Sequence, residues 1–184
     1  MPEDAPEEFS SAIERIRAVR LRPEIVLEEV PAPQRIAPHA VALGADVVQD
    51  DEELATGRFV LLYDPSGQDA WEGTFRAVTF VRAALEAEFG TDPMIGQVGW
   101  TWLQECLDSS AARYTAVGGT VTRVVSESFG ALGDRPATVE IEIRASWTPL
   151  DDVGVHLQAW AALLCTVAGL PPLPAGVAPL PRRR

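Results

Sequence analysis

The sequence contains no lysine, and its 184 residues include only two cysteines and two histidines. Without lysine the chain cannot form a Schiff base, and it cannot supply the lysine of a phosphate-binding P-loop. Cys106 and Cys165 stand alone without a CxxC pair, and two histidines do not complete a typical zinc site. We therefore predict no metal site and no cofactor, and we expect two buried, reduced thiols.

Apolar runs are also short, and none approaches the roughly 20 residues that cross a bilayer. The first residues, MPEDAPEEF, are acidic, whereas a secretion signal begins with basic residues and continues with apolar ones. The net charge of −12 disfavours contact with nucleic-acid phosphates, even though several arginines gather near the N-terminus. We expect a cytoplasmic protein that does not contact a membrane, and among its possible partners we rank nucleic acid, bound through the N-terminal arginines, last.

What the sequence does contain is typical of one soluble globular domain: 47% apolar and 23% charged residues. The composition changes at both ends of the chain. We predict a flexible acidic N-terminus over residues 1–8, a single domain over 9–170, and a proline-rich basic tail over 171–184.

Hydrophobic periodicity divides the domain into helices and strands. The predicted helices cover residues 10–22, 98–110 and 153–168, and the predicted strands cover 24–30, 38–48, 58–63, 73–82, 119–126 and 137–147. Residues 71–89 suit a helix or a strand, and we favour a strand over 73–82 followed by a helical turn, because β-branched and aromatic residues are frequent there. The run 49–54 is interpreted as a solvated acidic loop. This order predicts an α+β fold, an antiparallel sheet of about six strands with helices packed on one face.

A polar loop joins the last two predicted strands and contains the sequence SESFG. This stretch is one residue short of the hydrolase motif G-x-S-x-G, and Ser128, Asp134 or Asp151, and His156 follow the hydrolase order. A nucleophile elbow needs a helix directly after the serine, but here the chain leads into another strand. The glycine that permits the tight turn is also missing. We therefore predict no catalytic residue.

Two kinds of binding site remain open. The first is a protein-docking or self-association surface around residues 126–135, and its candidate residues are Trp100, Glu127, Ser128, Phe129, Asp134 and Arg135. The second is a small-molecule or enzyme pocket between the sheet and the helices, lined by Trp102, His156 and Trp160. We favour a non-enzymatic interaction protein, although the 126–135 loop also suits a plain hairpin connection.

Several word-like segments carry a family resemblance: VGWTWL, YTAVGGTVTRVVSESFG, DRPATVEIEIRASWTP and the ending LCTVAGLPPLPAGV…LPRRR. With these segments the chain, from about Phe9 to Arg184, resembles an uncharacterised actinobacterial family that is known as a domain of unknown function. The resemblance implies a cytoplasmic, single-domain protein without an assigned activity, and it transfers no catalytic residue. It also makes the SESFG…DRPA loop part of the family's signature, which favours a functional loop.

Overall fold

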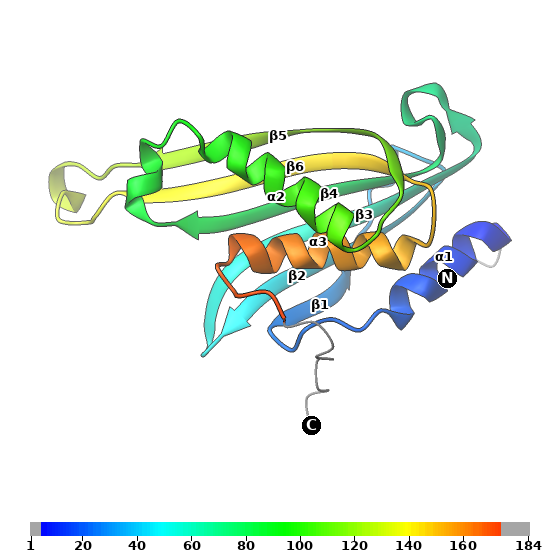
Figure 1. The fold of residues 1–184 in the computed structure, drawn as a ribbon, viewed down its shortest axis with the longest axis horizontal. Coiled ribbons are helices and arrows are strands. Elements are labelled where there is room, and N and C mark those ends of the chain that lie inside the picture. The colour runs from blue at the N-terminus through cyan, green and yellow to red at the C-terminus, as the bar shows by residue number, and fades with distance from the viewer. Residues whose placement is uncertain (1–4, 174–184) are drawn as a thin grey trace.

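The computed structural model describes residues 5–173, which form a six-stranded antiparallel sheet and three helices (Figure 1). The helices are α1 (Glu7–Ala18), α2 (Ile95–Ser109) and α3 (Val153–Val167). The strands are β1 (Ile25–Val30), β2 (His39–Gln49), β3 (Glu52–Gln68), β4 (Gly73–Leu85), β5 (Tyr114–Ser126) and β6 (Thr138–Pro149). They lie in the order β1-β2-β3-β4-β6-β5. The predicted α+β fold is confirmed.

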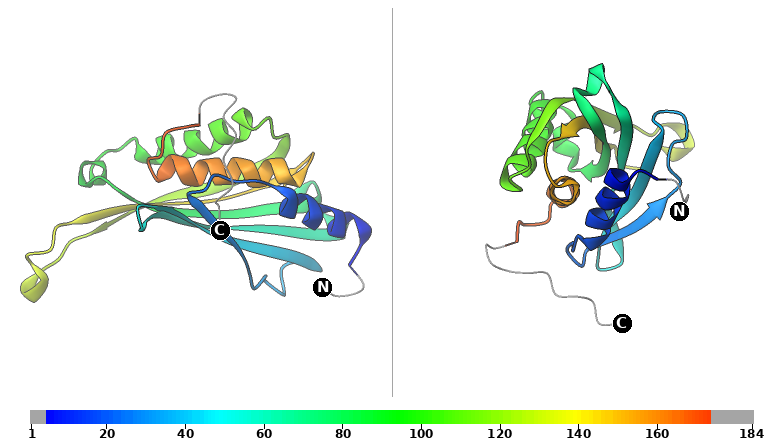
Figure 2. Two further views of the ribbon diagram at one scale, coloured as in Figure 1. Left: turned by 90° about the horizontal axis from the view of Figure 1, so that it is seen from below. Right: turned by 90° about the vertical axis from the view of Figure 1, so that its right-hand side faces the viewer.

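The three helices pack on one face of the sheet (Figure 2). Strict alternation places Ile141, Ile143 and Trp147 of β6 on this covered face, where all three are buried. Trp160 of α3 packs against Phe59 of β3, with ring centroids 5.7 Å apart. The main hydrophobic core therefore lies between α3 and the central strands.

The first helix begins earlier than the sequence pattern predicts and ends earlier as well. Pro6 precedes its first turn, and Glu7 and Glu8 lie in that turn, where acidic side chains suit the helix dipole. The carboxylate of Glu8 also accepts a hydrogen bond from the hydroxyl of Tyr63, at 2.7 Å. The end of the predicted flexible segment 1–8 is thus part of α1. Most of the predicted tail, 174–184, lies outside the described residues, as do residues 1–4.

The predicted acidic loop at 49–54 is wrong in extent. Only Asp50 and Asp51 lie between β2 and β3, with φ of 52° and 64°. Two consecutive residues with positive φ are typical of a tight hairpin turn, and aspartate tolerates this conformation better than most residues do. The favoured strand at 73–82 is confirmed as β4, and a 3-10 turn, η2 (Ala87–Gly90), follows it.

The face of the sheet opposite the helices, which we call the open face, is covered only in part. A small second core of Ala42, Val60, Leu62 and Trp71 occupies its β2–β3 side. Trp71 comes from η1 (Asp69–Trp71), and its carbonyl oxygen accepts a hydrogen bond from the hydroxyl of Thr148. In the described part of the chain, no helix lies over the β4–β6–β5 side of the open face (Figure 2).

The hairpin of β5 and β6 forms a long arm that extends past the helix layer, and the loop between the two strands lies at its far end (Figures 1 and 2). Within residues 5–173, no helix is long and apolar enough to span a membrane.

Candidate functional site

The loop at the end of the arm presents apolar side chains to solvent. Phe129 is 75% exposed, and Leu132 and Val125 are exposed as well. The loop has a regular backbone conformation, because it contains the 3-10 turn η3 (Gly130–Leu132). The amide of Leu132 donates to the carbonyl of Phe129 at 3.1 Å, and the amide of Arg135 donates to the carbonyl of Leu132 at 3.0 Å. An ordered backbone therefore holds an exposed phenyl ring at the tip.

Polar candidates surround this ring. Glu127, Asp134 and Arg135 are exposed and Ser128 is half-buried. No residue within 5–173 forms a side-chain hydrogen bond or an ion pair with any of these four side chains.

The hydrolase-like order of serine, aspartate and histidine does not assemble into a triad. His156 and Asp151 meet at the start of α3, where the imidazole Nε2 lies 2.6 Å from a carboxylate oxygen. Ser128 lies in the loop at the opposite end of the molecule (Figure 1). A nucleophile must lie within hydrogen-bond reach of its base, and this serine does not.

His156 is occupied on both ring nitrogens. The indole nitrogen of Trp147 donates to Nδ1 at 2.9 Å, so Nε2 carries the proton and donates to Asp151. The imidazole is fully buried, and burial lowers its pKa below the usual 6.5 although Asp151 acts in the opposite direction. This chain of bonds ties β6 to the start of α3 and leaves the histidine no free nitrogen to act as a base.

The tryptophans named from the sequence pack into the body of the protein. Trp102 is half-buried against the main core, and Trp160 is fully buried, with its indole nitrogen 3.3 Å from the carbonyl oxygen of Phe80. Trp100 also packs against the core, beside Gly119 of β5. Gly119 lies seven residues before the end of β5, roughly 23 Å along the strand. The structure thus places Trp100 away from the loop.

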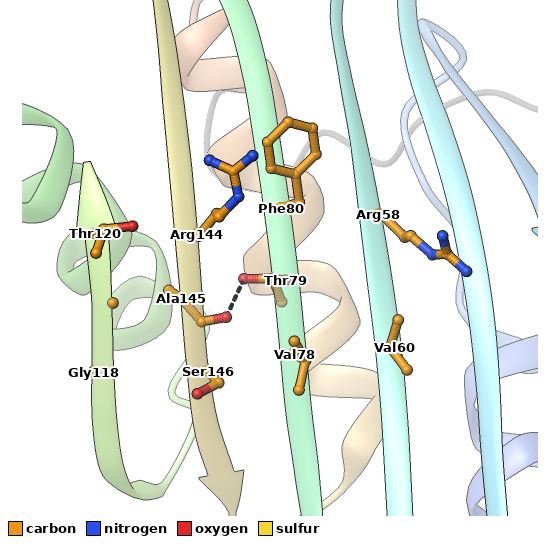
Figure 3. Close-up of a pocket in the computed structure, with 11 residues that line it drawn as sticks. Arg58, Val60, Val78, Thr79, Phe80, Gly118, Thr120, Arg144, Ala145 and Ser146 are labelled. Atoms are coloured by element: carbon orange, nitrogen blue, oxygen red, sulfur yellow. Dashed lines mark hydrogen bonds between the residues drawn. The ribbon is translucent and has the colours of Figure 1, made fainter. Parts of the chain in front are cut away.

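A cavity of about 590 Å³ lies on the open face, on the other side of the sheet from the helices (Figure 3). We call it the open-face groove. Its lining residues are Arg58, Val60, Val78, Thr79, Phe80, Gly118, Gly119, Thr120, Arg144, Ala145 and Ser146. The alternative pocket predicted from the sequence lies between sheet and helices, but this cavity occupies the opposite face.

Strand register explains the shape of the groove. Val60, Val78 and Ser146 are consecutive cross-strand partners, and Gly118 continues the row on β5. The next row along the strands contains larger side chains, Arg58, Phe80, Arg144 and Thr120. A row of small side chains beside a row of large ones leaves a hollow, with the large row as one wall.

The arginines around the groove are held in different ways. The guanidinium of Arg144 lies over the ring of Phe80, 4.9 Å from its centroid, and donates to Glu142 at 2.7 Å. The guanidinium of Arg58 points away from the groove (Figure 3) and donates to the carbonyl oxygen of Pro31 at 2.6 Å. Arg76, next to the groove, donates to the hydroxyls of Ser146 and Thr148 at 2.8 and 3.1 Å.

Sequence reasoning missed the groove because its residues are spread over four strands. The available signal was Val78 and Phe80, which alternate with the covered-face residues Ala77 and Val81 and give β4 apolar side chains on both faces. Within the described chain, no group of three or more histidine, cysteine, aspartate or glutamate side chains could hold a metal ion.

Comparison with known protein families identifies the chain. Residues 5–178 match the family described as "Protein of unknown function (DUF3000)", so the chain belongs to this family. Comparisons with the curated proteins and with the solved structures gave no significant match.

Proposed function

We propose that this DUF3000 protein is a non-enzymatic interaction protein that docks a protein partner through the tip of its β5–β6 arm. The observation that carries the proposal is the 75% exposure of Phe129 at the end of the arm. Single exposed apolar residues are common on protein surfaces. A phenyl ring on an ordered turn, with the exposed Leu132 three residues away, is instead typical of an interface anchor.

The chemistry of the tip indicates the kind of partner. Phe129 and Leu132 need an apolar pocket, and the exposed Glu127, Asp134 and Arg135 around them need polar or charged groups at its rim. This arrangement, with an apolar centre and a polar border, is typical of protein–protein interfaces. The proposed partner is therefore a protein with a hydrophobic pocket and charges of both signs at its edge.

Self-association through a sheet edge is the second candidate. β5 is an edge strand of thirteen residues, much longer than the five or six residues of an average strand. Within residues 5–173 its outer backbone groups have no partner strand, and such an edge can pair with another chain. A second copy could add its own β5 there and extend the sheet.

A cytoplasmic location and an actinobacterial origin belong to the same proposal. The location is supported by the two cysteines, which are free thiols in α2 and α3. Burial raises the pKa of the Cys165 thiol to about 11, so it remains protonated and unreactive. Unpaired thiols of this kind are typical of proteins in reducing compartments.

Photo-crosslinking tests the docking proposal. A benzophenone amino acid replaces Leu132, and native lysate is irradiated with the otherwise unchanged protein. A discrete adduct should form, and adding Phe129→Asp should abolish it, because a carboxylate cannot enter an apolar pocket. Val26→Asp is the matched control: Val26 is 45% exposed, but it lies on β1 at the other edge of the sheet.

The outcomes separate the two candidates. An adduct that contains a different protein and is lost only with Phe129→Asp supports docking by the tip. Two results together overturn both candidates. One is a protein that stays strictly monomeric in sedimentation at high concentration, and the other is an adduct that still forms in the Phe129→Asp variant. A concentration-dependent dimer that a proline in β5 abolishes, for example Val124→Pro, supports pairing through the edge.

A further inference from the structure

The open-face groove is a second candidate site that is independent of the arm tip. Its floor is apolar: Val78 is 38% exposed on β4, beside its cross-strand partner Val60. Its volume of about 590 Å³ lies in the range of sites for small organic ligands, roughly 300–1,000 Å³. An apolar ligand that covers this floor would remove exposed apolar surface from water, which favours binding.

The charge around the groove is opposite to the charge of the protein as a whole. Among the lining residues are two arginines and no carboxylate: Arg144, and Arg58, whose guanidinium points away from the groove. The whole chain, by contrast, has a net charge of −12. Glu142 neutralises part of the charge of Arg144, but within residues 5–173 no carboxylate forms an ion pair with Arg58.

A third arginine, Arg76, lies next to the groove, and the nearby carboxylate of Glu72 offsets part of its charge. The guanidinium of Arg76 reaches Ser146, which lines the groove, and bonds hydroxyl oxygens there instead of a carboxylate. Ser146 and Thr120 also provide hydroxyl groups that can donate to an anion. Arginine side chains and hydroxyl donors thus surround one apolar hollow in a protein that is acidic as a whole.

We propose that the open-face groove binds a small organic anion with an apolar body, such as a short acyl or aromatic carboxylate. The body lies on Val78, beside the buried Val60, in the row of small side chains that ends at Gly118. The anionic group points toward the row of Phe80 and Arg144. One guanidinium nitrogen of Arg144 bonds Glu142, and the remaining N–H donors, which bond no other residue in the described part of the chain, can bond the anion.

A displacement assay tests both halves of this ligand, the apolar body and the charge. The protein is titrated with 8-anilinonaphthalene-1-sulfonate, an aromatic anion whose fluorescence rises in apolar sites. Octanoate, octanol and octyltrimethylammonium then compete with it, because they share one chain and differ in the charge of the head group. Octanoate should displace the probe at a concentration at least about fivefold below that of the cation, the effect of one modest ion pair.

Matched variants locate the binding site. Val78→Asp should abolish probe binding, because it places a carboxylate on the apolar floor. Arg144→Gln should weaken octanoate about fivefold and leave octanol unchanged. Arg82→Gln is the control: Arg82 lies on β4 two residues after Phe80, pairs with Glu140 and does not line the groove. Melting followed by circular dichroism checks that each variant is folded.

Three results would overturn the proposal. The first is displacement that does not depend on the charge of the head group. The second is an equal loss of octanoate binding in Arg82→Gln and Arg144→Gln, which would indicate a general effect of surface charge. The third is a folded Val78→Asp variant that binds the probe as the parent protein does. None of these results depends on Phe129, so they leave the docking proposal unaffected.

Discussion

The two faces of the sheet are made by the same strands but differ in how deeply their side chains are buried. On the covered face, Phe59 and Trp147 are fully buried under the helices. On the open face, Val60 is buried by the small second core, but Val78, its neighbour on β4, is exposed. Alternation in a strand thus decides which side chains share a face, and the segments that pack onto that face decide whether it becomes core or binding surface.

Exchanging one phenylalanine on each face should produce the largest difference. Phe59→Ala removes a fully buried ring that contacts Trp160 and should lower the free energy of unfolding by about 3–5 kcal/mol. Phe80→Ala removes a half-buried ring and its contact with Arg144, and should cost under about 1.5 kcal/mol. Urea unfolding measures both. Equal losses would mean that the open face is packed as core.

Two adjacent glycines of β5 allow the two faces to be compared by adding one methyl group to each. A Cβ at Gly119, on the covered face, would overlap the carbonyl oxygen of Arg144 and lie 2.9 Å from Cα of Ala145. Gly119→Ala should therefore cost about 1–3 kcal/mol. A Cβ at Gly118, on the open face, would meet no atom within 4 Å. Gly118→Ala should be neutral or slightly stabilising in thermal unfolding, and a loss like that of Gly119→Ala would contradict the assigned register.

Acidification should lower the free energy of unfolding through His156, which is buried against the covered face. Burial lowers the pKa of this histidine in the folded protein, so the unfolded chain binds a proton more readily. Its contribution to stability is complete above about pH 6.5 and is lost as the pH falls below that value. Between pH 7.5 and 5.5 the loss should reach at most about 1.4 kcal/mol, measured by urea unfolding at each pH.

The protein's other histidine provides the control for this pH effect. His39→Gln should keep the pH dependence, and His156→Gln should reduce it. An identical dependence in both variants would assign the effect to other groups.

The smallest effect on stability is expected at the arm tip. Phe129→Ser changes a side chain that is 75% exposed, and should alter the free energy of unfolding by less than about 0.5 kcal/mol. If urea unfolding showed a loss above about 1 kcal/mol, the ring would stabilise the fold, which would contradict a role only in partner binding.

Local patterns in the sequence predicted most of the elements, because each one is encoded by neighbouring residues. The alternation from Val139 to Trp147 predicted β6, and the apolar stripe from Val153 to Val167 predicted α3. The start of α1 was missed because part of what holds Glu8 is Tyr63, far away in the chain.

The candidate sites were only partly predictable for a related reason. The exposed loop around Phe129 was visible in the sequence, because a hairpin connection is local and its side chains have few neighbours. The bond between His156 and Asp151 and the location of Trp100 beside Gly119 depend on the packing of separate elements. The groove depends on the register of four strands, and no single segment specifies it.

The sequence by itself determined the helices, the strands, their alternation and the absence of lysine chemistry, because these properties follow from residue types and short spacings. Only the tertiary structure decided which apolar side of β3 and β4 receives the helices and which is left as a groove. The physical reason is that burial depends on the segments that pack onto a surface, and here those segments are separated from it along the chain by tens of residues.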